Sequence, residues 1–419
     1  MIKKITVNIV FTLFLIPQFS VSEEIELIDM LCQKQVLTHS ECQTLEKRIV
    51  NKSGETQELI SSSGKPKICS KNKEFCTKIG GRIHMDAGIV KDGNRELTPG
   101  NGTEVRRARL SVAGRVYSDW RYKLRVDFSG NEVSMKDANL NYQPYKLVFG
   151  LSKVLYSMED KTSSNDTMFM ERSLMNELVP GRRVGLGVRR AFQTLHISGN
   201  LYGQAIADGE EGDEGIGAAF RVHHVPIKHK TAVLHYSISA AIEQPEDDVN
   251  REINLRTRPE YHITDRLLDS GSISDVDYFL RSHAEAAAVY GPYVFQTEYA
   301  RVDIERRDGS PSLTFSGAYL QLAWMISGES RPYKSSTGVF TRVKPKHESG
   351  AWQVALRYSE LSLNDADISG GKESNWTLGL NWFANARVRF SANLIQVDTN
   401  KDAGDFNPLI LAFRGQLVF

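Results

Sequence analysis

Hydrophobic and polar positions alternate along most of this chain, most clearly over residues 409–419. Leu411, Phe413 and Leu417 fall on one parity, whereas Arg414 and Gln416 fall on the other. Successive side chains of a β-strand point to opposite faces, so this segment has one apolar and one polar face. The same alternation recurs at 122–129, 352–359, 376–383 and 388–394. We count about sixteen such runs, at the ~10-residue length of tilted transmembrane strands.

The pattern predicts an all-β fold, a transmembrane antiparallel β-barrel of about sixteen strands with lipid outside and water inside. Aromatic residues near the ends of the runs, such as Trp120, Tyr142, Trp352 and Trp376, are typical of interfacial girdles. The strands of a soluble β-sandwich or β-helix also alternate apolar and polar residues. It would need one core for some 350 residues, which exceeds the usual size of a single core.

The N-terminus indicates export. Lys3 and Lys4 precede an apolar run that Pro17 closes, and small residues at 20–22 suit signal-peptidase cleavage before Glu23. We therefore predict a signal peptide at 1–22. Helical spacing and a capping box, Thr38 with Glu41, predict a helical hairpin that a polar linker follows, and we assign 23–66 to this periplasmic segment. The barrel then occupies 67–419, with one further candidate helix around 162–178.

The four cysteines, Cys32, Cys42, Cys69 and Cys76, all lie in the first fifth of the chain. An oxidising compartment permits disulfides, and four cysteines allow three pairings. We favour Cys32–Cys42 with Cys69–Cys76, because each pair closes a short loop. Zinc binding is the alternative, which the absence of a Cys-x-x-Cys pair disfavours.

Bulk charge does not indicate a partner, because the formal net charge is +1; we expect no nucleic-acid partner. The placement of charge is more informative. If the apolar parity faces lipid, an arginine-rich set points into the lumen, where guanidinium groups attract oxyanions. This ladder comprises Arg107, Arg109, Arg115, Arg125, Arg357, Arg387, Arg389 and Arg414. The alternative is that these arginines pair with lumenal acids such as Asp86, Asp127 and Asp137 and only brace the wall.

A second basic cluster, residues 331–346, lies between two of the alternating runs and is long enough to fold into a pore mouth, although such loops are often only solvated surface.

Sequence motifs for catalysis or metal binding are weak. No GxSxG or HExxH motif is present, so we expect no enzyme. His223, His224, His229 and His235 lack carboxylates at ligand spacing, so we expect neither a metal site nor a cofactor.

At this point the motifs resemble those of the phosphate-selective porins O and P. In order they are KIGGR (78–82), VRRARL (105–110), DWRY (119–122), TSS (162–164), FMER (169–172), GESRPYK (328–334), VKP (343–345), GAW (350–352), LRY (356–358) and LGLNW (378–382). The resemblance implies a sixteen-stranded homotrimeric barrel in the bacterial outer membrane, with inward-folded loops and lysines at a constriction. Lys334 and Lys344 fall on the family's Tyr-Lys and Lys-Pro motifs. The resemblance implies that these two lysines bind the anion at the constriction, together with Arg121, which follows the motif's Trp where the best-studied members carry Lys.

The resulting hypothesis is a passive, anion-selective porin whose partners are small anions, with phosphate or polyphosphate as the expected cargo, and outer-membrane lipid. Three alternatives remain. The first is a general-diffusion porin for carboxylates or other small solutes. The second is a barrel plugged by its loops that acts as an adhesin or structural protein, and the third is an outer-membrane hydrolase.

Overall fold

The computed structural model describes residues 30, 32, 34, 38, 40–44, 58–59, 66–91, 100–203, 214–245, 251–307, 309–400 and 406–419. The predicted signal peptide and most of the predicted helical hairpin lie outside these residues, so both stay predictions. Among the residues described, no helix is long and apolar enough to cross a membrane.

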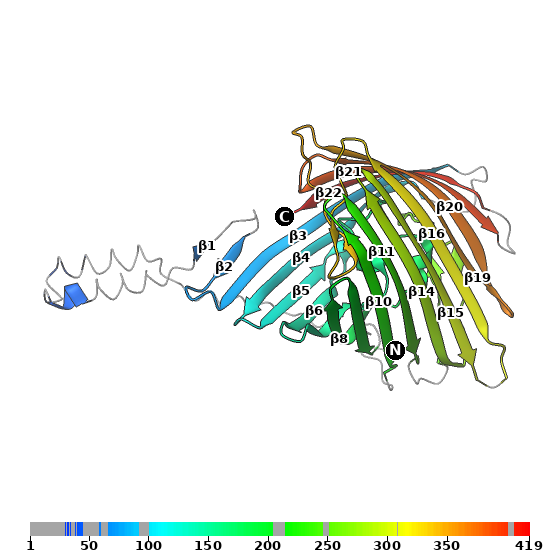
Figure 1. Cartoon of the computed structure of the whole chain (residues 1–419), viewed down its shortest axis with the longest axis horizontal. Coiled ribbons are helices and arrows are strands. Elements are labelled where there is room, and N and C mark those ends of the chain that lie inside the picture. Colours follow the sequence, from blue (N-terminus) through cyan, green and yellow to red (C-terminus); the bar gives the residue numbers. More distant parts are fainter. Residues whose placement is uncertain are drawn as a thin grey trace, which may run out of the picture.

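Sixteen antiparallel strands close into a barrel, which confirms the predicted all-β class (Figure 1). They are β3 (Phe75–Lys91), β4 (Gly102–Val116), β5 (Trp120–Asp127), β6 (Ser134–Tyr142), β7 (Leu147–Lys153), β8 (Arg182–Phe192), β9 (Leu195–Tyr202), β10 (Gly217–Lys228), β11 (Ala232–Glu243), β14 (Val276–Tyr290), β15 (Tyr293–Arg306), β16 (Leu313–Met325), β19 (Ala351–Asp365), β20 (Ile368–Phe383), β21 (Val388–Asn400) and β22 (Leu409–Val418). Closure occurs where β22 pairs with β3, with Arg414 opposite Asp86. No strand of the barrel is therefore left as a free edge.

The outer face of the wall is apolar, as the alternation requires. Phe413 is 47% exposed, whereas its neighbour Arg414 is 3% exposed and points inward. Aromatic side chains pair across strands near their ends, for example Trp352 with Trp382 and Tyr293 with Trp324. Such a belt, with rings at its margins, is typical of a wall that faces a bilayer.

The two ends of the barrel differ in their connections. At the turn end, short turns such as 117–119, 193–194 and 291–292 join the strands; at the loop end the connections are mostly longer. Three long segments fold into the lumen. The lumenal loop (154–181) and the entry loop (251–275) start from the loop end, whereas the turn-end loop (326–350) starts from the other. Apolar residues of the lumenal loop, including Tyr156, Leu174 and Met175, pack against β14–β16 and β19.

The inner loops contain only short elements. The lumenal loop holds helix α3 (Met158–Lys161) and the 3₁₀ helix η2 (Leu174–Leu178), the entry loop holds β12 (Arg256–Thr257) and β13 (Leu268–Asp269), and the turn-end loop holds β17 (Tyr333–Lys334) and β18 (Val339–Phe340). A further 3₁₀ turn, η1 (Ser129–Asn131), follows β5. The prediction of a helix around 162–178 is therefore wrong. Backbone carbonyls of this segment are instead bonded by arginines of the wall.

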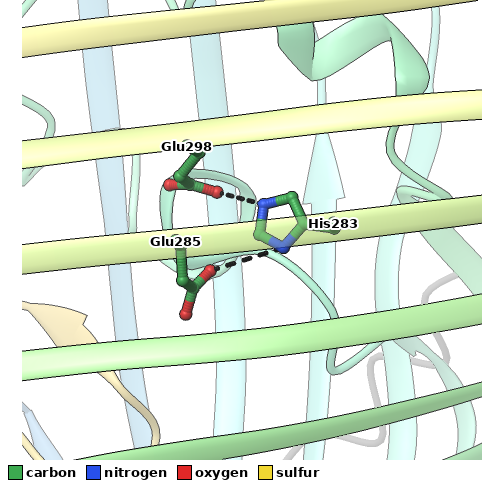
Figure 2. Close-up of side chains that lie close together, drawn as sticks. All are labelled: His283, Glu285 and Glu298. Carbon is green, nitrogen blue, oxygen red and sulfur yellow. Dashed lines mark hydrogen bonds and ion pairs between the residues drawn. The ribbon is translucent and has the colours of Figure 1, made fainter.

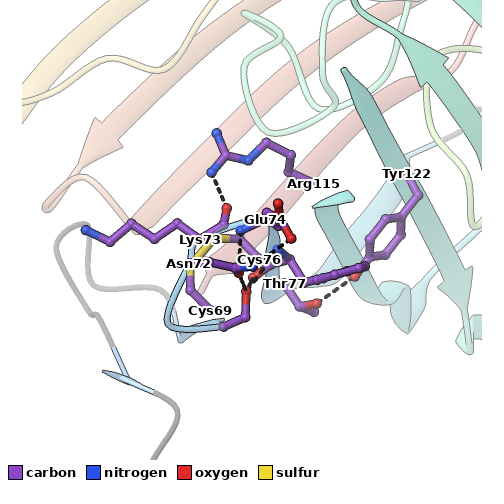
Figure 3. The surroundings of a disulfide bond; sticks show 10 residues. Cys69, Asn72, Lys73, Glu74, Cys76, Thr77, Arg115 and Tyr122 are labelled. Atoms are coloured by element: carbon purple, nitrogen blue, oxygen red, sulfur yellow. Dashed lines mark hydrogen bonds between the residues drawn. A yellow bond between two sulfur atoms is a disulfide. The ribbon is translucent and has the colours of Figure 1, made fainter. Parts of the chain in front are cut away.

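The segment that precedes the barrel attaches to its first strand. Strand β1 (Glu58–Leu59) pairs with β2 (Lys67–Cys69), and β2 pairs with β3, placing Cys69 opposite Cys76. A disulfide joins these two cysteines, and Arg115 of β4 donates to the carbonyl of Lys73 beside it (Figure 3). A second disulfide joins Cys32 to Cys42. The backbone N–H of Thr38 donates to the Glu41 carboxylate at 2.9 Å, as in a capping box.

Candidate functional site

A basic cavity of about 340 Å³ lies between the lumenal loop and the wall formed by β3–β9. Its basic side chains come from five strands and the lumenal loop: Arg82, Arg107, Arg109, Lys123, Arg125, Lys153, Lys161, Arg172, Arg182 and Arg189. Among the residues that the structure describes, the one carboxylate that lines this cavity is Asp137. Ten basic side chains around one cavity make a strongly anion-attracting space.

Asp137 does not cancel that charge. Its Oδ2 lies 2.9 Å from Lys123 Nζ and 3.0 Å from an Arg125 terminal nitrogen, and Arg182 Nε is 3.8 Å from Oδ1. One negative charge is thus shared by three positive ones. Similarly, Asp127 pairs with Arg109 at 2.6 Å. Both acids fix the direction of cationic side chains while the cavity keeps a net positive charge.

The lumenal loop contributes a cluster at the inner side of the cavity. Lys161 ends α3, lies half-buried at the cavity, and donates to the Lys153 carbonyl at 3.0 Å. Burial, and to a lesser extent nearby Arg189 and Lys123, lower the pKa of Lys161 to about 7. Three residues further on, the hydroxyl of Ser164 accepts a hydrogen bond from Arg82 at 2.8 Å. Ammonium, guanidinium and hydroxyl groups together match the oxygens of a hydrated oxyanion.

Lys161 and Arg82 are absent from the site residues that the sequence predicts. A signal for both is present, because Arg82 ends the KIGGR motif and Lys161 directly precedes the TSS motif. What the sequence does not show is that β3 and the lumenal loop meet.

Arg106 is also missing from the prediction, and a β-bulge explains why. In the β3–β4 register, His84 is opposite Arg107 and Met85 is opposite Val105, so Arg106 is the extra residue. Strict alternation would place the Arg106 side chain on the lipid-facing side of the wall. The bulge instead sends both Arg106 and Arg107 inward, where each donates two hydrogen bonds to Glu171 of the lumenal loop, at 3.0–3.2 Å.

The predicted arginine ladder divides into three groups. Arg107, Arg109 and Arg125 line the basic cavity. Arg115 and Arg387 lie at the turn end, the first bonded to Lys73 and the second in the turn between β20 and β21.

The third group anchors the lumenal loop. Arg389 donates to the carbonyls of Thr167 and Met168, at 2.7 and 3.1 Å. Arg357 pairs with Glu260 of the entry loop and stacks on Phe169 at 4.4 Å.

Arg414 completes this anchoring group. It is 2.7 Å from Asp86 and 2.6 Å from Glu171. Its partner Asp86, with Asp127 and Asp137, is among the acids that the bracing interpretation names.

A second cavity, of about 320 Å³, continues the basic one toward the turn end, and the two share Leu155, Arg189 and Thr337. Arg121 and Lys334 both line it, so the structure brings these two predicted constriction residues together. Lys344 is solvent-exposed and lines neither cavity. We call this second space the exit cavity.

One group of side chains among the described residues has the composition of a metal site: His283, Glu285 and Glu298 (Figure 2). All three are buried in the lumen wall. Their oxygens are already engaged, since Glu298 accepts from His283, Ser157 and Tyr319, and Glu285 accepts from His235 and the Met158 N–H. A cation would have to displace these donors, so the set is better explained by hydrogen bonding to the lumenal loop.

Comparison with known proteins identifies related sequences. The family model of the phosphate-selective porins O and P matches residues 77–419. Porin O of Pseudomonas aeruginosa is 26% identical over 391 residues, covering 82% of this chain and 87% of that protein. An uncharacterized protein of Caulobacter vibrioides is 28% identical over 354 residues, covering 80% of this chain and 70% of that protein.

Solved structures share the fold at low identity. OmpT of Vibrio cholerae, in a form lacking loop L8, superposes with a TM-score of 0.53 at 10% identity, covering 83% of this chain and all of that one. An anion-selective porin from Comamonas acidovorans gives a TM-score of 0.51 at 14% identity, with 83% and 100% coverage.

Proposed function

Because the chain belongs to the phosphate-selective porin O and P family, we propose that this outer-membrane porin is a passive channel for small oxyanions, with phosphate or polyphosphate as the physiological cargo. The observation that carries the proposal is the basic cavity, with ten cationic side chains around about 340 Å³. An anion entering it exchanges part of its hydration shell for ammonium, guanidinium and hydroxyl donors. We propose a channel rather than an enzyme, because the family and the barrel fold both point to a channel.

The path we propose runs from the entry loop, through the basic cavity, to the exit cavity. By the usual orientation of such barrels, the short turns face the periplasm and the long loops face outward. Lys161, with Arg82 and Ser164, forms the inner binding site, and Arg121 with Lys334 receives the anion at the periplasmic side. Lys344 contributes only to the surrounding charge. Binding at each step has to stay weak enough for release.

The proposed homotrimer is supported by the uneven height of the wall. Strands β5, β7 and β9 have 8, 7 and 8 residues, whereas β19 and β20 have 15 and 16. A tilted spanning strand needs about 9–11 residues. We therefore place the subunit contact on the short wall, where a neighbouring copy removes the mismatch with lipid. Variant F149C on outward-facing β7 should cross-link between copies in native membranes, whereas L322C on the tall wall should not.

Single-channel recording tests the channel function. Purified protein in a planar bilayer under a KCl gradient should give a reversal potential set by chloride, and added phosphate should block the chloride current. Variant K161M should raise the half-blocking phosphate concentration by about tenfold, the effect of losing one charge-assisted hydrogen bond. K372M is the matched control, because Lys372 is exposed on β20 outside the two cavities.

Other outcomes favour the alternatives. Chloride selectivity without phosphate block would indicate a general anion porin. Absence of channels from protein that shows a heat-modifiable band would indicate a plugged barrel with an adhesive or structural role.

A further inference from the structure

Two carboxylates lie inside the barrel on the wall opposite the basic cavity, where an anion channel would be expected to avoid negative charge. Glu285 of β14 and Glu298 of β15, which we call the acid clamp, have fully buried side chains that converge on the ring of His283 (Figure 2). The lumenal loop separates them from the basic cavity, and neither lines it. They therefore do not contact a permeating ion in the cavity.

The acid clamp binds the first turn of α3. Glu285 Oε2 accepts the backbone N–H of Met158 at 2.7 Å, and Glu298 Oε1 accepts that of Glu159 at 2.7 Å. The hydroxyl of Ser157 donates to Glu298 Oε2 at 2.6 Å. The first N–H groups of a helix have no partner within the helix, so these wall carboxylates supply the acceptors that α3 lacks.

The clamp itself is held in place by side chains of the wall. His283 Nε2 is 2.8 Å from Glu298 Oε2, and the Tyr319 hydroxyl donates to Glu298 Oε1 at 2.6 Å. His235 Nε2 is 2.8 Å from Glu285 Oε1, which also pairs with buried Arg221. Each carboxylate therefore has a fixed direction, as residues that support a binding site require.

Helix α3 transmits this constraint to the cavity, because it is a single turn. The N–H of Lys161 donates to the Ser157 carbonyl at 3.1 Å, and that of Thr162 donates to the Met158 carbonyl at 2.9 Å. The residue held by the clamp and the lysine at the cavity are thus joined by one hydrogen-bonded turn. A displacement of the first turn at Met158 therefore displaces the backbone that carries the Lys161 side chain.

We propose that Glu285 and Glu298 are positioning residues for anion binding, so that the anion preference of this channel depends on two buried acids that never touch the anion. The proposal rests on the proposed function, since it acts through Lys161. Their effect is to hold α3 so that the Lys161 ammonium points into the basic cavity.

The test is a double-mutant cycle on phosphate block, recorded from channels that show the heat-modifiable band. E298Q keeps the size of the side chain, but its amide NH₂ cannot accept the bonds that one carboxylate oxygen accepts. We expect E298Q to raise the half-blocking phosphate concentration about tenfold, and to have no further effect in a K161M background, because the two changes remove the same interaction. E285Q provides a second, independent variant, and E305Q is the control, because Glu305 lies at the end of β15 and bonds Ser312.

The outcomes separate the two proposals. If K161M weakens block and E298Q and E285Q do not, the clamp proposal is wrong and the proposed function stands. If E298Q adds its full effect to K161M, the acids act independently of Lys161 and the positioning role is refuted. If K161M itself leaves the block unchanged, the proposed inner binding site is wrong.

Discussion

The pH dependence of anion selectivity tests the charge of Lys161 directly. The pKa of this lysine is lowered to about 7 by burial, with help from Arg189 and Lys123. A lysine is cationic below its pKa, so between pH 6 and pH 8 the charged fraction falls from about 90% to about 10%. Anion selectivity should therefore be greatest in acid and fall as the pH rises through about 7.

The size of the change follows from Coulomb's law. A unit charge about 6 Å from an ion, at an effective dielectric constant of ~20–40, interacts by roughly 1–3 kcal/mol. That corresponds to about tenfold or more in an equilibrium constant. Nine other basic side chains line the cavity, most of them arginines, so selectivity should weaken without reversing.

The assay is the reversal potential in a KCl gradient between pH 5.5 and 8.5, with chloride as the anion because phosphate itself titrates in this range. Two carboxyl groups of the lumenal loop, Glu159 and Glu177, also have pKa values raised to about 7, chiefly by burial. Their protonation makes the lumen more positive in acid, which is the same direction of change. Variants of Lys161 separate these contributions.

K161M should lie near the weakly selective level of alkaline wild type, and K161R near the acidic level, since arginine stays charged. Each variant should keep only the part of the inflection near pH 7 that Glu159 and Glu177 contribute. An inflection as large in K161M as in wild type would assign it to the carboxyl groups, and a flat wild-type curve would show that Lys161 keeps its charge.

Three further predictions concern residues elsewhere in the lumen and at its rim. K334M should reduce chloride selectivity measurably and K344M should not, because only Lys334 lines the exit cavity; equal effects in the reversal potential would contradict this placement. E171Q should lower stability by about 3 kcal/mol, because Glu171 pairs with three guanidinium groups, and the temperature at which the heat-modifiable band disappears measures the loss. Replacing Cys69 and Cys76 by Ser should speed amide exchange in β2, because about 2–3 kcal/mol of local stability is lost. Single-channel conductance should not change; a lower conductance would show that this disulfide at the rim affects the pore.

Much of the barrel could be predicted from sequence, because the face on which a strand residue lies is a local property. Parity alone places Phe413 outside and Arg414 inside, and the structure agrees. Parity fails at Arg106, where a bulge shifts the register by one residue. This bulge lies beside the lumenal loop, and it lets both Arg106 and Arg107 donate hydrogen bonds to Glu171.

The site was less predictable, because the same residue type serves two purposes. Arg109 and Arg389 look alike in sequence, as inward arginines on alternating strands. The structure puts Arg109 at the cavity and uses Arg389 to bond carbonyls of the lumenal loop. Lys161 lies on no strand, so no periodicity could mark it.

Alternation with period two involves only neighbouring residues, so the local pattern is enough to specify the barrel, its apolar exterior and an arginine-rich interior. Which cations face the path is set by packing between distant parts of the chain. That choice depends on where the lumenal loop lies, and its contacts join residues far apart in the chain, such as Arg389 with Thr167 across 222 positions and Arg414 with Glu171 across 243. Pairings over such distances leave no local pattern in the sequence.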